Sequence, residues 1–168
     1  QQREALKIAK EGVVNAINNL SGFAAKHKDL ATLAFTHYQP AQPTTVGKRH
    51  TLYIQDLLMD LRNLEYTEGM MRARGVKGTT GTQDSFLELF DGDHDKVKEL
   101  DRRFAEKIGF GQSLPITSQT YTRKLDAMVA KAVSGIGDSA HKFGVDLRLL
   151  ANMKEQEEPR EKNQTGSS

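Results

Sequence analysis

The stretch TYTRKLDAMVAKAVSGIGDSAHKFGVDLRLLANMKEQE, residues 120–157, decides the fold. Its apolar side chains recur close to every 3.5 residues, with some polar or small interruptions, as on one face of a long helix. These positions are Val129, Ala132, Ile136, Phe143, Leu147 and Leu150. At the helical rise per residue such a helix would be roughly 55 Å long. Because long helices with one apolar stripe usually pack as bundles, we expect an all-α, long-helix bundle.

Four further segments show helical periodicity, and the stretches between them carry the residues that break helices. The expected helices are residues 2–27, Thr44 or Thr45 to about Arg74, 84–90 and 93–108. The expected connections are residues 28–44, 75–83 and 109–119. Pro40 and Pro43 exclude a helix interior from the first connection, and glycine at every third position marks the second as a loop. No alternation typical of a strand persists over more than a few residues.

The composition is that of one ordinary domain. The chain has 168 residues, of which 37% are apolar, and its 24 basic and 22 acidic residues leave a net charge of +2. This balance does not predict a nucleic-acid binder. The absence of cysteine excludes disulfides, a cysteine nucleophile and thiolate zinc sites. No stretch approaches the roughly 18 apolar residues of a membrane span.

Both ends of the sequence look truncated. The chain begins with Gln1 inside a helical pattern that has no capping residue before it, and it ends in the polar stretch EPREKNQTGSS. A chain trimmed for expression and one segment of a longer protein both fit. We expect the segment, because a natural domain rarely starts inside a helix.

Two motifs resemble ligand sites but lack their defining residues. Asp91, Asp93 and Asp95 alternate as in a calcium loop, yet Lys96 stands at its sixth position and Arg102 at its twelfth. We therefore expect a solvated acidic turn. The stretch GVKGTTGT lacks the Gly-Lys-Ser/Thr that closes a phosphate-binding P-loop, so a plain turn and a weaker anion contact both remain open.

His37 is the candidate functional histidine. It lies in the non-helical segment THYQPAQP, where prolines limit the backbone and amide side chains can orient an imidazole. From spacing alone, a functional role and a satisfied structural role both remain open. The other four histidines form no metal-binding pair and are expected to be surface or packing residues; they are His27, His50, His94 and His141.

Several stretches together resemble a known family. THYQPAQPTTVGKR, residues 36–49, resembles the histidine segment of the fumarase/aspartase superfamily, and RGVKGTTGTQ, residues 74–83, resembles its adenylosuccinate lyase family. TSQTY, residues 117–121, is similar to that family's substrate-contacting glutamine segment. RLLAN at 148–152, followed by QTGSS at 164–168, resembles the approach to the superfamily's signature loop.

The resemblance covers essentially the whole chain. It implies that residues 1–168 are most of the central helical-bundle domain, with the N-terminal and C-terminal domains absent. It further implies a carbon–nitrogen lyase of purine biosynthesis, which releases fumarate from adenylosuccinate to give AMP and from the succinyl-carboxamide ribotide SAICAR to give AICAR. The family requires no cofactor and no metal. It is expected to be a cytoplasmic homotetramer with shared active sites, binding neither nucleic acid nor membrane.

The resemblance also assigns an acid and a base. His37 would be the general acid that protonates the departing nitrogen, a role that suits an imidazole because its pKa lies near working pH. Ser167, the first serine of the expected signature loop, would be the general base, and the neighbouring Ser168 is the alternative candidate for this role. Serine acts as a base only when its surroundings activate it.

Further residues are assigned to substrate binding by the same resemblance. Thr36 and Gln119 would hydrogen-bond the succinyl carboxylates and so stabilise the carbanion that forms beside them. Lys77, Thr79 and Thr80 lie in the glycine-rich stretch, where they either contact the substrate or shape the loop.

Three alternatives remain open. An argininosuccinate lyase shares the Thr-His-x-Gln pattern, but its family fits the glycine-rich stretch poorly. A non-catalytic helical bundle with the same fold is disfavoured by the intact His37, Gln119 and Gly-Ser-Ser. A nucleic-acid-binding helical module is disfavoured by the near-neutral charge, and binding that falls steeply with salt would favour it again.

Overall fold

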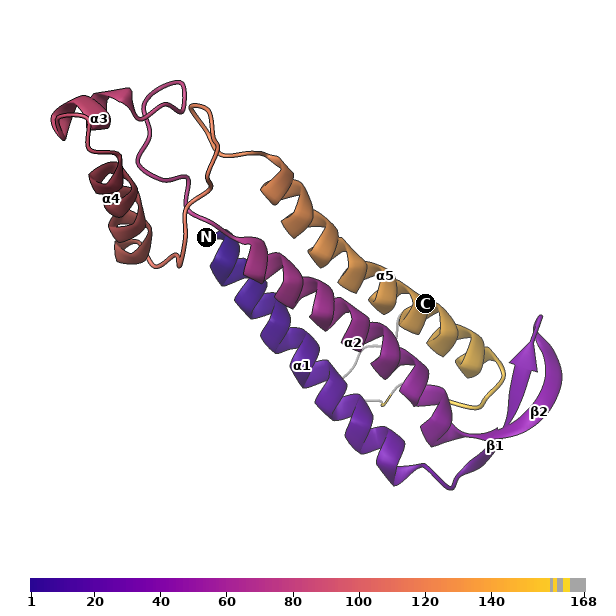
Figure 1. Cartoon of the computed structure of the whole chain (residues 1–168). Coiled ribbons are helices and arrows are strands. Elements are labelled where there is room, and N and C mark those ends of the chain that lie inside the picture. The colour runs from indigo at the N-terminus through magenta and orange to yellow at the C-terminus, as the bar shows by residue number, and fades with distance from the viewer. Residues whose placement is uncertain (158, 160–161, 164–168) are drawn as a thin grey trace. The chain divides into compact units, whose positions relative to one another are not determined.

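The computed structural model describes residues 1–157, 159 and 162–163. In chain order its elements are α1 (Gln2–Lys26), β1 (Ala31–Thr36), β2 (Gln39–Thr45), α2 (Val46–Met70), α3 (Asp84–Leu89), α4 (His94–Lys107) and α5 (Lys124–Asn152) (Figure 1). The mainly helical fold is therefore as predicted, and each expected helix is present. The longest helix, α5, is shorter than expected at both ends. Residues 31–45, expected only to be non-helical, form a two-stranded hairpin that the sequence did not predict.

The chain divides into two compact units. One comprises Gln1–Gly12 and Leu61–Val133, and we call it the loop unit because it contains the two long connections; the other comprises Val13–Asp60 and Ser134–Ser168, and we call it the hairpin unit. The helices α1, α2 and α5 contribute residues to both units. The segments singled out from the sequence are thus divided between two separately packed bodies.

Aromatic side chains pack the helices of the hairpin unit. Tyr53 of α2 is buried, and its ring meets Phe143 of α5 edge-on with 5.0 Å between ring centroids. His50 is also buried, 4.4 Å from the ring of Phe23 of α1, and its Nδ1 lies 2.9 Å from the carbonyl oxygen of Val46. His50 is thus a packing histidine, as expected from the sequence.

The start of α2 is fixed by a cap and by a close helix contact. The hydroxyl of Thr45 accepts a hydrogen bond from the backbone N–H of Lys48 at 3.0 Å, which makes Thr45 the N-cap. At Gly47 an added Cβ would lie 2.4 Å from the carbonyl oxygen of Ala24 in α1. Glycine therefore lets α1 and α2 approach each other directly beneath the hairpin.

The acidic turn that resembles a calcium loop is a helix cap. The carboxylate of Asp93 accepts hydrogen bonds from the backbone N–H groups of Asp95 and Lys96, each at 3.1 Å, at the start of α4. The Lys96 backbone bond lowers the pKa of Asp93 below its ordinary value. Val97 and Ala105 on the opposite face of α4 are buried in the loop unit.

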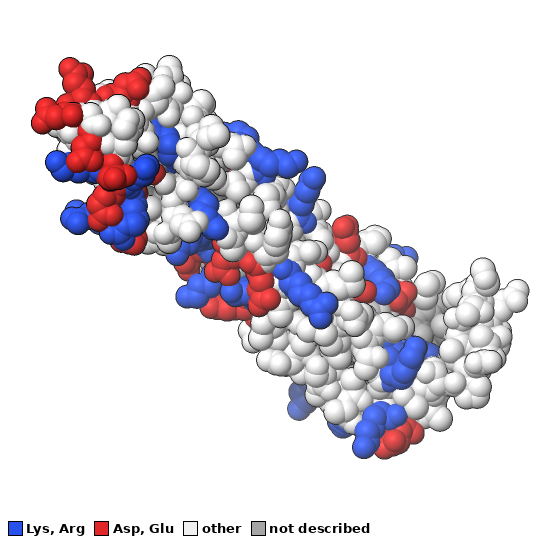
Figure 2. All heavy atoms as spheres, in the orientation of Figure 1, with Lys and Arg blue, Asp and Glu red and all other residues white. Residues whose placement is uncertain are grey.

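The surface carries both signs of charge. On the face shown in Figure 2, Lys and Arg lie among Asp and Glu over much of the surface, and Asp and Glu side chains gather near α3. The hairpin, residues 31–45, contains no charged residue at all. Across the described residues, no helix combines the length and apolar character needed to cross a bilayer.

Candidate functional site

His37 occupies the tip of the hairpin in a strained backbone conformation. The strands β1 and β2 are antiparallel, and Thr36 pairs with Gln39, so His37 and Tyr38 are the two turn residues. Their φ angles are +53° and +59°. Two left-handed residues define a type I′ turn, which normally takes Asn-Gly or Gly-Gly. Each non-glycine residue there costs roughly 1–2 kcal/mol. The chain thus holds His37 and Tyr38 in a backbone conformation that non-glycine residues rarely adopt.

The hairpin has no core of its own. None of residues 31–45 is buried, and the side chains of Thr36 and His37 are exposed. Pro40 and Pro43 lie in β2, where each lacks an N–H to donate to the ladder, and the pairing shifts register between Leu33 and Phe35. The imidazole is therefore presented outward, on a support that other elements must hold in place.

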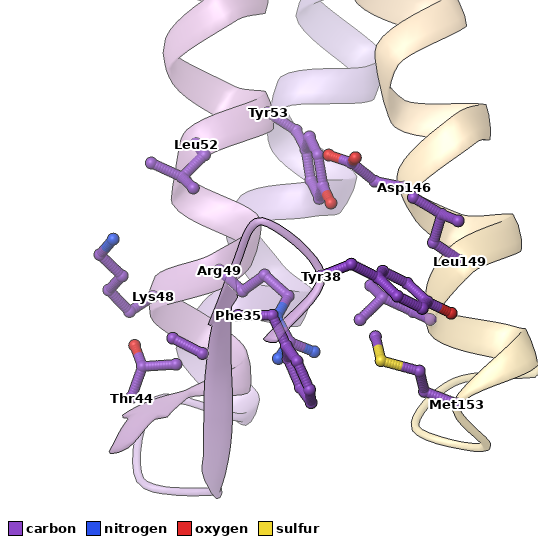
Figure 3. Close-up of a pocket in the computed structure, with 12 residues that line it drawn as sticks. Phe35, Tyr38, Thr44, Lys48, Arg49, Leu52, Tyr53, Asp146, Leu149 and Met153 are labelled. Carbon is purple, nitrogen blue, oxygen red and sulfur yellow. The ribbon is translucent and has the colours of Figure 1, made fainter. Parts of the chain in front are cut away.

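A pocket of about 310 Å³ lies at the base of the hairpin (Figure 3). Phe35, Tyr38 and Leu149 give it apolar walls, and Tyr53 and Asp146 add polar groups. Burial raises the pKa of the Tyr53 phenol to about 12, and the Asp146 carboxylate beside it adds to the rise. The phenol is therefore neutral at physiological pH. Tyr38 lines this pocket, whereas His37, the other residue of the turn, does not.

In the loop unit, backbone hydrogen bonds pair the two connections that carry the other candidate residues. We call residues 75–83 the glycine loop and residues 113–121 the glutamine loop. The N–H of Ala73 donates to the carbonyl of Gln112 at 3.0 Å, and the N–H of Leu114 donates back to the carbonyl of Ala73 at 2.8 Å. This pairing brings the two loops together at their bases.

Arg74 joins the two loops. Its guanidinium donates to the carbonyl oxygens of Lys77 at 3.0 Å and Gly78 at 2.7 Å in the glycine loop. It also donates to the carbonyl of Ser118 at 3.0 Å in the glutamine loop. Since one rigid side chain satisfies carbonyls of both loops, Arg74 fixes the backbone next to Gln119 relative to the glycine loop.

Lys77 faces the interior of the loop unit. Only 4% of its side chain is exposed, and its Nζ donates to the carbonyls of Arg74 at 3.0 Å and Leu114 at 2.7 Å. The carboxylate of Asp101 in α4 lies 3.8 Å away and also accepts from the N–H of Val76 at 2.6 Å. Of the two roles left open for Lys77, this geometry favours shaping the loop.

We predict that Lys77→Met destabilises the intact protein by about 1–3 kcal/mol, because two partly buried carbonyls lose their donor. The measurement is the midpoint and slope of urea unfolding. Lys7→Met is the matched control, because the Lys7 side chain is 61% exposed and, among the described residues, forms an ion pair with Glu11 alone, at 4.0 Å. Unchanged stability together with a raised KM would instead assign Lys77 to the substrate.

Three candidate side chains remain exposed on the paired loops. Thr79 and Thr80 lie at the turn of the glycine loop, and Gln119 lies on the neighbouring glutamine loop. The contact between the loops is tightest at Gly81, where φ is +89° and an added Cβ would lie 1.9 Å from the carbonyl oxygen of Thr117. The loop unit thus supports one surface that combines hydroxyl and amide groups.

The structure therefore places the sequence-predicted residues in two groups. Thr36 and His37 belong to the hairpin unit, whereas the other binding candidates belong to the loop unit. Ser167 lies outside the described residues, as does Ser168. Within the described part of the chain, no group of three or more His, Asp or Glu side chains is placed to hold a metal ion.

Arg74 and Asp101 hold the loop unit's surface in place, and neither was expected to do so. Arg74 was visible as the cation directly before the glycine-rich stretch. Asp101 carries no such signal, because it lies in a charged helix whose acidic residues are otherwise typical of a solvated face.

Comparison with known proteins identifies the family. The sequence profile of a lyase family matches residues 3–168. Adenylosuccinate lyase of Saccharomyces cerevisiae is 55% identical over 166 residues, which is 99% of this chain and 34% of that enzyme. Adenylosuccinate lyase of Schizosaccharomyces pombe is also 55% identical over 166 residues, with the same coverage. The chain thus spans about a third of the length of these curated relatives.

Solved structures show the same fold at low identity. Fumarate lyase from Mesorhizobium sp. BNC1 superposes with a TM-score of 0.76 at 19% identity, covering 91% of this chain and 34% of that one. A β-carboxy-cis,cis-muconate cycloisomerase from Acinetobacter calcoaceticus gives a TM-score of 0.73 at 20% identity, covering 89% and 33%. Fold, motifs and profile agree, and the chain belongs to this lyase family of the fumarase/aspartase superfamily.

Proposed function

We propose that the chain is the central helical-bundle domain of an adenylosuccinate lyase. The full-length enzyme would cleave adenylosuccinate to AMP and fumarate, and SAICAR to AICAR and fumarate. The observation that carries this proposal is the 55% identity to the two yeast adenylosuccinate lyases over 99% of the chain. The matched region spans both loops and the hairpin, because it covers nearly the whole chain.

Both reactions are β-eliminations that break a carbon–nitrogen bond. A base removes a proton from the succinyl carbon next to a carboxylate, and the electron pair left behind forms the new C=C bond as the C–N bond breaks. His37 donates a proton to the departing nitrogen. The I′ turn supports this role, because it presents the imidazole at an exposed tip, and general acid catalysis requires direct reach to the reacting atom.

Ser167 supplies the base in this proposal, activated when the signature loop closes over the substrate and excludes water. Thr36 and Gln119 bind the succinyl carboxylates and so stabilise the carbanion. The exposed amide of Gln119 and the exposed hydroxyl of Thr36 are free of the core and fit this role. Thr79 and Thr80 lie beside Gln119 on the paired loops and extend the binding surface.

The expected oligomeric state and cellular compartment rest on the resemblance to the family. We expect the full-length enzyme to be a cytoplasmic homotetramer whose active sites combine residues from several subunits, with a subunit interface on α5 beside the apolar stripe of residues 129–150. Ala132 and Leu150 of that stripe are already buried within one chain, whereas Val133 and Leu149 beside them are 43% exposed. Exposed apolar side chains on α5 support an interface there.

The test is fumarate release by the full-length protein with adenylosuccinate, SAICAR and argininosuccinate offered separately. We expect release from the first two and none from the third. Release from argininosuccinate alone would keep the elimination chemistry and overturn the purine assignment. Release from none of the three would make a non-catalytic bundle the better account.

A further inference from the structure

The hairpin that carries His37 requires an external support. A two-stranded hairpin alone is marginally stable in water. This one has no buried residue, two prolines in β2 and two left-handed residues in its turn. Its position is therefore set by the polar contacts that neighbouring elements make with it.

Arg49 of α2 makes the most extensive of these contacts. Its Nη2 donates to the carbonyl oxygen of Leu33 at 2.8 Å, at the point where the strand register shifts. Its Nη1 donates to the carboxylate of Glu155, just beyond α5, at 2.6 Å. The same Glu155 oxygen accepts from the hydroxyl of Thr32 in β1 at 3.0 Å. Both partners thus bind β1, and each also binds the other.

The pair is partly withdrawn from water. The exposed fractions of the Arg49 and Glu155 side chains are 12% and 21%, so the interaction is less screened than a surface ion pair. The planar guanidinium donates to its two acceptors from two separate nitrogens in a fixed geometry, whereas a lysine has a single nitrogen from which to reach both. A second link, from the hydroxyl of Tyr38 to the side-chain oxygen of Asn152 at 2.9 Å, holds the turn itself.

We propose that the Arg49–Glu155 pair is the positioning device that fixes the His37 hairpin for proton transfer. This proposal rests on the proposed lyase function and on His37 as the general acid. The role proposed for these two residues is positioning and not contact with the substrate. They act by holding β1, and so the turn, because proton transfer fails when a donor is displaced by a small distance.

The test is a double-mutant cycle in the full-length protein, with adenylosuccinate as substrate. Arg49→Lys keeps the charge and loses one of the two acceptors. We expect kcat to fall roughly 10- to 100-fold, with KM changing less than about threefold, as for a displaced catalytic group. In a His37→Asn background the same substitution should cost less than about threefold, because there is no imidazole left to position.

Lys48→Arg is the matched control, a change of cation at the neighbouring residue. The Lys48 side chain is exposed and has no hydrogen bond to the hairpin within the described part of the chain. We expect its kcat to be unchanged. Hydrogen exchange of residues 31–45 should speed up in Arg49→Lys and not in this control, and this readout does not depend on activity.

The outcomes separate the two proposals. An equal loss of kcat when Arg49→Lys is made in the parent and in the His37→Asn protein would assign Arg49 to general stability and overturn the positioning role. An unchanged kcat for Arg49→Lys, in an enzyme that cleaves adenylosuccinate, would overturn it as well while leaving the function intact. A parent protein that releases no fumarate would overturn the proposed function, and the positioning role with it.

Discussion

Replacing His37 with asparagine in the full-length protein should lower kcat for adenylosuccinate cleavage by roughly 10²–10⁴-fold, the usual size of general acid catalysis. Asparagine removes the imidazole but readily adopts the left-handed conformation that this turn position requires. The thermal midpoint should therefore stay the same or rise slightly. A large rate loss without a loss of stability separates chemistry from folding, which His37→Ala would not do as clearly.

His94→Asn is the control for this experiment. His94 is the exposed first residue of α4, and its replacement should leave kcat unchanged. Steady-state kinetics and thermal unfolding on the same preparations provide both readouts. A kcat for His37→Asn within about threefold of the parent value would remove His37 from the mechanism.

Gly81→Ala should have the largest effect on the loop unit. Alanine is strained at a φ of +89°, and its Cβ would lie 1.9 Å from the backbone carbonyl oxygen of Thr117. Because this oxygen belongs to the backbone, it cannot move aside as the end of a flexible side chain could. We expect a destabilisation of about 2–4 kcal/mol, from the left-handed strain plus the forced displacement of the glutamine loop. KM for adenylosuccinate should rise, because Gln119 moves with that loop.

Gly78→Ala provides the comparison within the same loop. An added Cβ there would approach Thr82 no closer than 3.4 Å, near ordinary van der Waals contact. Its unfolding midpoint in urea should shift much less than that of Gly81→Ala. Equal shifts for the two variants would show that the packing of the glycine loop against Thr117 is unimportant.

The helices could be predicted because their signals are local. The apolar repeat of α5, the caps at Thr45 and Asp93 and the glycines of the loops each act within a few residues of sequence. The ends of α5 were less predictable. The helical pattern continues through residues 120–157, whereas the helix covers only Lys124–Asn152.

The hairpin could not be predicted, because it lacks local signals of this kind. Its turn lacks the Asn-Gly or Asp-Gly signal, and β2 contains two prolines and shows no alternating burial. Part of what holds it is distant in sequence: Asn152 and Glu155 reach it from the end of α5, while Arg49 reaches it from the start of α2. Contacts of this kind leave no periodicity in the chain.

The candidate site was predicted through resemblance more than through physics. Spacing alone left His37 and the glycine-rich stretch undecided between function and structure. The structure adds a reason to favour function for His37, namely its strained and exposed backbone position. For Lys77 the structure adds a reason to favour a structural role. Its ammonium is turned inward toward Leu114 and Asp101, which only the tertiary packing could show.

The most direct test of the account is the appearance of fumarate when the full-length protein is mixed with adenylosuccinate, measured beside the His37→Asn variant at equal concentration. We expect one fumarate and one AMP for each adenylosuccinate consumed, with the variant slower by roughly 10²–10⁴-fold. Absence of fumarate with the parent protein would contradict the proposed function, and equal rates for the two proteins would contradict the role of His37.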